Sequence, residues 1–152
     1  MIEYQVPRRE VAATVVLDDG RTLECTLFTA VSSPEGGPQL VIDRLNDSSE
    51  EFVPVAGGDD RFLVSKPGIV TVQITQRDEL QAMESDAGRD APVRLSLAGG
   101  INLVGRFRIV MPPERARVID FLNEASRFVP LFGEDRVTLV QRSYIVTVRS
   151  AI

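Results

Sequence analysis

The chain has 152 residues, of which 43% are hydrophobic and 26% charged, a composition typical of a globular protein rather than a disordered one. It has no histidine and a single cysteine, which excludes the Ser-His and Cys-His nucleophile pairs and a structural zinc site. We therefore expect a protein that is not an enzyme and that uses no cofactor and no metal.

The residue pattern also bears on the location of the protein. No stretch approaches the roughly 18 consecutive apolar residues of a membrane span, and no basic segment followed by an apolar run opens the chain. The lone Cys25 forms no intramolecular disulfide and is expected to face inward from a strand. These observations predict a cytoplasmic protein without membrane contact, and no small-molecule substrate is evident.

Three short motifs occur twice, in the same order. They are Val-Ile-Asp-x-Leu-Asn at residues 41–46 and 118–123, Phe-Val-Pro at 52–54 and 128–130, and Ile-Val-Thr-Val at 69–72 and 145–148. Repetition with a conserved order indicates a duplicated domain. We predict repeats at residues 11–75 and 92–150, joined by a linker at residues 76–91. Domains this small bury little apolar surface, so we expect the copies to pack on each other or on a second chain.

Each copy begins with a predicted hairpin. Apolar residues alternate on both sides of Asp-Asp-Gly at residues 18–20, and again around Ala-Gly-Gly at residues 98–100. Gly105 stands where the first copy has Cys25, and a glycine inside a strand is typical of a bend or bulge. The sequence therefore predicts a curved β-hairpin at the start of each copy.

The segment after the hairpin differs between the copies. In the second copy, prolines at 112 and 113 precede residues 115–125, where Ala116, Ile119 and Leu122 fall on one helical face, so a short helix is predicted. In the first copy, a loop rich in Ser, Gly and Pro precedes residues 39–46. For those residues a helical turn and the end of a strand both remain open.

Three more strands are predicted in each copy, and a short helix is expected in the first half of the linker. The strand candidates are residues 52–55, 62–65 and 69–74 in the first copy, and residues 128–132, 137–141 and 144–149 in the second. The last two strands of each copy are separated by only two or three residues, which requires a very tight turn.

This pattern resembles a known architecture. Five strands with a bent second strand and a tight turn before the fifth are similar to a small SH3-like or Sm-like barrel. Residues 137–148 resemble the closing hairpin of Sm-like proteins, the class of the bacterial RNA chaperone. Residues 93–105 resemble the opening strands of the same fold. The repeated motifs resemble an uncharacterised bacterial domain of unknown function, which implies no activity. The fold expected is mainly β, with two tandem five-stranded barrels that each carry a short helical segment.

Charge is distributed unevenly along the chain. Residues 1–76 carry 6 basic and 12 acidic side chains, a net charge of −6, whereas residues 92–152 carry 9 arginines and 5 acidic side chains, a net charge of +4. One explanation of this charge separation is that the sequences of the two copies diverged in a genome whose base composition favours arginine. The separation also fits head-to-tail contacts between chains, or a cationic face for an anionic partner.

Two polar pairs recur in the repeated motif: Asp43 with Asn46, and Asp120 with Asn123. Residues three apart share a helix face, so each pair is a candidate contact for a partner. The structural alternative, which we favour, is that asparagine ends the helical turn in a left-handed conformation and aspartate accepts nearby backbone N–H groups.

The function expected is a non-enzymatic adaptor or regulatory module that binds a protein partner or associates with itself. The alternative is an Sm-like nucleic-acid-binding protein that uses the arginine-rich second copy. The candidate residues for that contact are Arg106 and Arg108 on one strand face, with Arg142 and Tyr144 at the last tight turn. Few aromatic side chains are left for base stacking, and the pI near 4.8 argues against this alternative.

Overall fold

A computed structural model describes residues 8–84 and 87–151. The N-terminal half comprises β1 (Arg8–Leu17), β2 (Thr22–Ala30), α1 (Val41–Asn46), β3 (Phe52–Gly57), β4 (Asp60–Ser65), the 3-10 turn η1 (Lys66–Gly68) and β5 (Ile69–Ile74). Helix α2 (Arg77–Met83) leads into the C-terminal half. That half comprises β6 (Arg89–Leu97), β7 (Ile101–Ile109), η2 (Pro113–Arg115), α3 (Val118–Glu124), β8 (Phe128–Phe132), β9 (Val137–Gln141), η3 (Arg142–Tyr144) and β10 (Ile145–Ser150).

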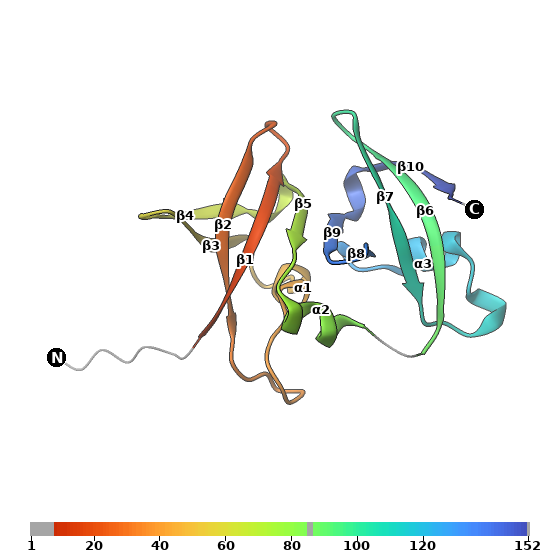
Figure 1. Cartoon of the computed structure of the whole chain (residues 1–152), viewed down its shortest axis with the longest axis horizontal. Helices are drawn as coiled ribbons and strands as arrows, with labels where there is room; N and C mark the ends of the chain where they lie inside the picture. Colours follow the sequence, from red (N-terminus) through yellow and green to blue (C-terminus); the bar gives the residue numbers. More distant parts are fainter. Residues whose placement is uncertain (1–7, 85–86, 152) are drawn as a thin grey trace.

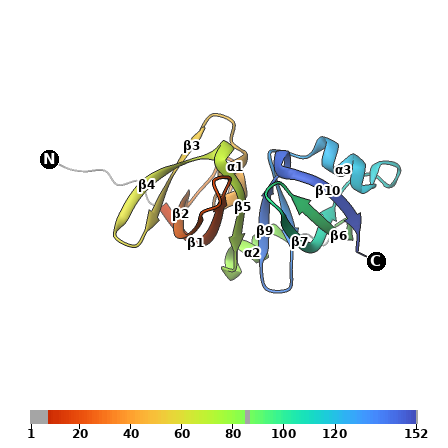
Figure 2. The same ribbon diagram turned by 90° about the horizontal axis from the view of Figure 1, so that it is seen from above.

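All ten strands belong to one antiparallel sheet, in the order β10-β6-β7-β8-β9-β5-β1-β2-β3-β4. The prediction of a mainly β fold is confirmed, but the prediction of two separate five-stranded barrels is wrong. Strand β5 pairs with β9, so the two halves continue into each other side by side (Figures 1 and 2). An unpaired edge leaves backbone N–H and C=O groups without partners, and this pairing satisfies one edge of each half.

Both halves follow the same internal strand order, with the fifth strand beside the first. Val15 pairs with Val72 in the N-terminal half, and Leu95 pairs with Val148 in the C-terminal half. Both of these pairings also contain a register shift near the turn. These matching registers define which residues hold equivalent positions in the two halves.

The hydrophobic core crosses the β5–β9 junction in both directions. Phe128, Val137 and Leu139 come from the C-terminal half but pack into the core of the N-terminal half. Val70, on β5, packs in turn with the core of the C-terminal half. The two halves therefore share their cores at the junction instead of touching only through surface side chains.

Several local predictions are confirmed. Both hairpins form, and Gly20, Gly99 and Gly100 have the positive φ that their turns require. Cys25 is buried. No bulge is found at Gly105, because the pairing of β6 with β7 continues through Val93 and Gly105 without a register shift. A Cβ atom on Gly105 would lie 2.7 Å from Cγ of Leu131, so this glycine instead allows β7 and β8 to approach closely.

The helices are close to what the sequence predicts. The expected helix of the second copy is α3, and the expected helix after β5 is α2. The question left open for the first copy is settled, because residues 41–46 form helix α1. No helix in the described part of the chain is long and apolar enough to span a membrane.

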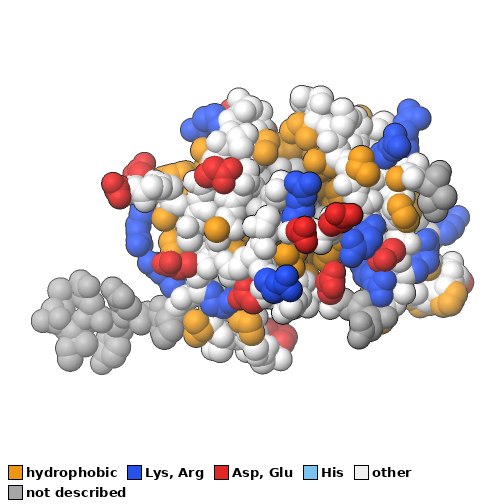
Figure 3. All heavy atoms as spheres, in the orientation of Figure 1, with side chains coloured by type: hydrophobic (Ala, Val, Ile, Leu, Met, Phe, Trp, Pro, Cys, Tyr) orange, Lys and Arg blue, Asp and Glu red, His pale blue; other side chains and the backbone are white. Residues whose placement is uncertain are grey.

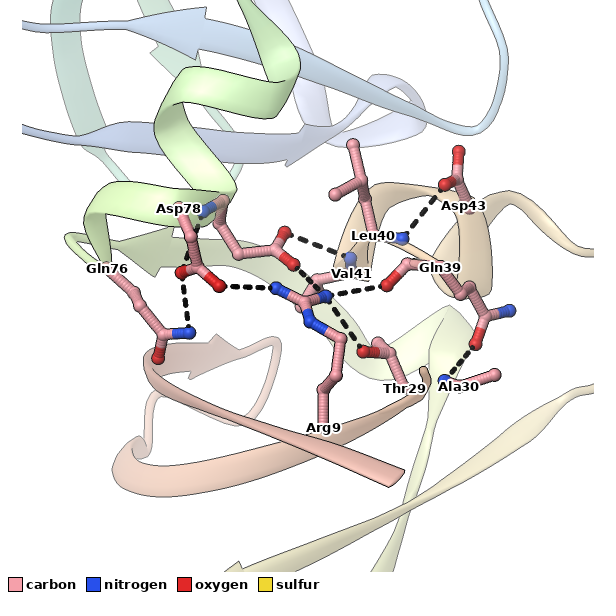
Figure 4. Close-up of polar contacts among 10 residues, drawn as sticks. Arg9, Thr29, Ala30, Gln39, Leu40, Val41, Asp43, Gln76 and Asp78 are labelled. Atoms are coloured by element: carbon pink, nitrogen blue, oxygen red, sulfur yellow. Dashed lines mark hydrogen bonds and ion pairs between the residues drawn. The ribbon is translucent and has the colours of Figure 1, made fainter. Parts of the chain in front are cut away.

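Helix α2 is tied to the N-terminal half by a buried ion pair (Figure 4). The carboxylate of Glu79 is fully buried and accepts hydrogen bonds from Arg9 at 2.6 Å and from the backbone N–H of Val41 at 3.2 Å. Arg9 also donates to Asp78 and to the backbone carbonyl of Gln39. This network holds β1, α1 and α2 together.

Lys66, the only lysine of the chain, is fully buried in η1. Its ammonium group donates to the carbonyl oxygens of Arg44 at 2.7 Å and Asp47 at 2.8 Å, near the C-terminal end of α1. Burial lowers the pKa of Lys66 below its ordinary value of 10.5, because it disfavours the charged form.

This lowered pKa predicts how the free energy of unfolding depends on pH. Between the lowered pKa and 10.5, the unfolded chain retains a proton that the folded chain has lost, so the contribution of Lys66 to stability rises with pH. Urea unfolding of the wild type and of Lys66→Met should show a difference that grows in favour of the wild type as the pH rises toward 10.5. A difference that does not change with pH would contradict this expectation.

Candidate functional site

A groove lies between α3, β6 and β10 at the C-terminal end of the sheet, and its larger part is mainly apolar. One part, of about 510 Å³, is lined by Val118, Ile119, Leu122 and Val148 among others. An adjoining part of about 430 Å³ shares Leu122, Asn123 and Val148 with the first and adds Val146. We refer to these two hollows together as the α3–β10 groove, defined by Val118, Ile119, Leu122, Asn123, Val146 and Val148.

The groove exposes side chains that a globular domain usually buries. Ile119 on α3 is 58% exposed and Val146 on β10 is 66% exposed. Strand β10 is also an edge strand of the sheet. Apolar side chains beside an open strand edge can accept a further polypeptide strand, with the backbone supplying hydrogen bonds and the groove supplying apolar contacts.

The local sequence explains why the groove forms. Helix α3 has apolar residues at 118, 119 and 122, and the Arg142 side chain donates hydrogen bonds to the carbonyl oxygens of Leu122 and Ala125 at its C-terminal end. These bonds satisfy carbonyl groups that a helix end leaves free. The helix is thereby fixed to η3, directly before β10.

The equivalent groove of the N-terminal half is already filled. It lies between α1 and β5, where Val41, Leu45 and Val72 are each at most 2% exposed. Phe128 and Leu139 of the C-terminal half pack into the same core cluster. In Figure 2, α1 lies next to the contact between the halves, whereas α3 lies at the outer end. The sheet thus contains one occupied groove and one open groove of the same construction.

Asn46 links the two halves at the occupied groove. Its side-chain oxygen accepts from the backbone N–H of Phe128 at 2.8 Å, and its side-chain nitrogen donates to the carbonyl oxygen of the same residue at 3.2 Å. The prediction that this asparagine adopts a left-handed conformation is wrong, because only glycines have positive φ among the described residues. The prediction for Asp43 is confirmed, since it accepts a hydrogen bond from the backbone N–H of Leu40.

We expect Asn46→Ala to lower the free energy of unfolding by about 1–3 kcal/mol, because it leaves the N–H and C=O of Phe128 without partners. Asn123→Ala is a matched control, since Asn123 holds the equivalent position but is exposed. In monomeric protein, the control should change stability by no more than about 0.5 kcal/mol in urea unfolding. Equal losses in the two variants would contradict the role assigned to Asn46.

The second polar pair is arranged differently from the first. Asp120 accepts two hydrogen bonds from the guanidinium group of Arg117, which lowers the pKa of that carboxyl group. Asn123 instead lines the α3–β10 groove. Of the two repeated pairs, only Asn123 therefore lies at the open surface described above.

The predicted cationic residues are engaged in contacts within the chain. Arg106 forms ion pairs with Glu84 and Asp90, and Arg108 pairs with Asp90. The hydroxyl group of Tyr144 donates to Asp18 and to the carbonyl oxygen of Pro67, across the junction. On the face shown in Figure 3, basic side chains gather over the C-terminal half with acidic ones between them. The structure does not bring Arg106, Arg108, Arg142 and Tyr144 together as one free cationic surface.

Comparison with protein-family models, with curated proteins and with solved structures found no match to this chain. In the described part of the chain, no three acidic or cysteine side chains are grouped so as to hold a metal ion. The features that distinguish the groove are the mainly apolar lining of its larger part and its position beside an edge strand.

Local sequence pattern does not indicate the α3–β10 groove. Ile119 and Leu122 were assigned to the inward face of a predicted helix, and Val146 belongs to a motif that reads as an ordinary buried strand. The signal that could have indicated the groove is the repeat itself. If one copy covers the fifth strand of the other, one fifth strand must remain at the end of the sheet.

Proposed function

We propose that this protein is a non-enzymatic protein-interaction module, an adaptor or regulatory subunit built from a duplicated small β domain. The observation that carries the proposal is the α3–β10 groove, an apolar surface that continues into an open sheet edge. The duplication is supported by the shared order of the five strands, the helix after the second strand and the 3-10 turn before the fifth strand in the two halves, with η2 as an addition in the C-terminal half. The sequence motifs repeat in the same places.

The mode of binding that fits this surface is addition of a strand to β10. An added strand would form backbone hydrogen bonds with the β10 edge, while its alternate side chains would enter the groove. Exposed apolar surface of this kind is typical of interaction sites. The occupied groove of the N-terminal half supports the proposal, because there the same arrangement of helix and strand binds β8 and β9.

The test uses tagged protein expressed in its native cells, with matched substitutions at two exposed apolar residues. Ile119→Asp places a charge in the groove, whereas Val104→Asp changes a valine that is 70% exposed on β7 and lies outside the groove. We expect wild type and Val104→Asp to recover the same protein partner in stoichiometric amounts, and Ile119→Asp to lose it. Equal recovery by all three proteins would contradict the proposal.

Nucleic-acid binding remains the competing proposal, and it makes a different prediction. Saturable binding of labelled single-stranded RNA or DNA that weakens steeply with salt, and that Arg106→Ala or Arg108→Ala reduces, would support it. The ion pairs of both arginines with acidic residues in the chain argue for the protein-interaction module instead. Fluorescence anisotropy of the purified protein decides between the two.

A further inference from the structure

We infer that the α3–β10 groove binds the β3–β4 edge of a second copy of this chain, and so repeats between chains the junction that joins the two halves. The inference rests on the proposed function, because it names the partner of the same groove. Strands β10 and β4 are the two edges of the sheet. They are equivalent to β5 and β9, which pair inside the chain.

Apolar side chains are exposed at both ends of the sheet. Phe52 on β3 is 56% exposed and Leu63 on β4 is 66% exposed, whereas the equivalent Phe128 and Leu139 are at most 1% exposed inside the junction. On the other side of the contact, Val146 is 66% exposed and the equivalent Val70 is 3% exposed. Side chains equivalent to those that the internal junction buries are thus exposed at the two ends of the sheet.

Backbone pairing follows the same correspondence. Inside the chain, Thr71 pairs with Val140 and Val72 pairs with Leu139. The equivalent pairs between chains are Thr147 with Val64 and Val148 with Leu63. Such a pairing would cover both edge strands, which otherwise expose unpaired backbone groups.

The asparagine contact can also be repeated. Asn46 binds the backbone N–H and C=O of Phe128 inside the chain. The equivalent side chain in the open groove is Asn123, which is exposed, and the residue equivalent to Phe128 is Phe52. We therefore expect Asn123 of one chain to bind the backbone of Phe52 of the next.

Charge favours the same partner. At the internal junction, Arg127 of the C-terminal half pairs with Glu51 of the N-terminal half at 3.3 Å. These two residues already pair with each other within each chain, so only charge attraction over a longer distance is left to favour the contact between chains. The net charges of −6 for residues 1–76 and +4 for residues 92–152 act in the same direction over a longer range.

The correspondence is incomplete at several positions, one of which is Gly68, the equivalent of the Tyr144 that binds Asp18 and Pro67 across the internal junction. Arg61 stands where the internal junction has the buried Val137, and Ser65 stands where it has Gln141. The Gln141 side chain donates across the internal junction to the carbonyl oxygen of Lys66, which the shorter Ser65 cannot reproduce. We therefore expect association between chains to be weaker than the contact between the halves, and to depend on protein concentration.

A contact between two different edges is heterologous, and each added chain presents the same free edges again. Repetition leads to a closed ring or to an open filament, according to the rotation between successive chains. In either case the mass increases with concentration beyond that of one chain.

The experiment disables each side of the contact separately. Val146→Lys places a charge in the groove, Leu63→Lys places one on the β4 edge, and Val104→Lys is an exposed control outside both surfaces. In sedimentation velocity, wild type and Val104→Lys should form species larger than the 16.7 kDa chain as concentration rises. Each of the other two variants should weaken this association by about tenfold or more, because an unpaired charge would be buried.

Mixing the two disabled variants provides the decisive observation. Leu63→Lys keeps an intact groove and Val146→Lys keeps an intact β4 edge, so the mixture should form a dimer of twice the 16.7 kDa chain mass and nothing larger. Circular dichroism checks that both variants are folded, which their exposed positions favour. Failure of the mixture to dimerise, or association that neither substitution weakens, would overturn the inference.

The outcome also separates this inference from the proposed function. A wild-type chain that stays monomeric, together with recovery of a different protein that depends on Ile119, would refute self-association and leave the interaction module standing. A wild-type chain that stays monomeric and recovers no protein in an Ile119-dependent manner would refute the two together.

Discussion

Phe128→Ala should lower the free energy of unfolding by about 3–5 kcal/mol, the usual cost of removing a large buried aromatic side chain. Phe128 belongs to the C-terminal half, but it is 1% exposed and packs in the core of the N-terminal half. The substitution leaves a cavity at the junction between α1, β5 and β8. We therefore expect both halves to lose stability together in urea unfolding, followed by far-UV circular dichroism.

The equivalent substitution in the N-terminal half is a matched control. Phe52 occupies the same position in the repeated Phe-Val-Pro motif but is 56% exposed. In monomeric protein, Phe52→Ala should therefore cost much less than Phe128→Ala. A loss of equal size in the two variants would contradict the conclusion that the C-terminal half fills the groove of the N-terminal half.

Glu79→Ala is the second substitution expected to have a large effect, with a loss of about 3 kcal/mol or more. The Glu79 carboxylate is fully buried and is bound by the guanidinium group of Arg9 and by the backbone N–H of Val41. Removal of the Glu79 side chain leaves the mostly buried guanidinium group of Arg9 and the buried N–H group of Val41 with one partner fewer each. Urea unfolding should show the loss, and hydrogen exchange should show that α2 opens more readily.

Asp78→Ala is the control for this ion pair. Asp78 also pairs with Arg9, at 2.9 Å, but its side chain is 61% exposed, so water replaces much of what the pair contributes. Its removal should cost far less than the removal of Glu79. If Asp78→Ala were the more destabilising variant, the buried pair would not be what holds α2 to the N-terminal half.

Local pattern was sufficient to predict most of the secondary structure. The two hairpins, the three later strands of each half and helix α3 follow from alternation, turn residues and helical spacing, which are properties of neighbouring residues. Local pattern does not decide the secondary structure of residues 41–46, because the short apolar run from Leu40 to Ile42 fits either a strand or a helix.

The connections between distant residues could not be predicted in this way. The sequence does not say which strand edge meets which, so the β5–β9 pairing and the single sheet were missed. Asn46 binds a residue 82 positions away, and nothing in its own motif indicates that partner.

The candidate site shows this limit most directly. Val70 and Val146 lie in identical Ile-Val-Thr-Val motifs, yet one is 3% exposed and the other is 66% exposed. The difference arises from position in the sheet, because β5 is internal and β10 is an edge. Periodicity describes both residues as strand residues with the same local context. Only the three-dimensional arrangement distinguishes a buried valine from one available to a partner.

The central claim is that a polypeptide docks on the α3–β10 groove, and site-specific photo-crosslinking tests it most directly. A photoreactive amino acid replaces Val146 in the groove or, as a control, Val104 on β7, and the full-length protein is irradiated in its native cells. We predict a covalent adduct with a protein, whether a second copy of the chain or another partner, from position 146 and not from position 104. No adduct from position 146 beyond that from position 104 would contradict the account.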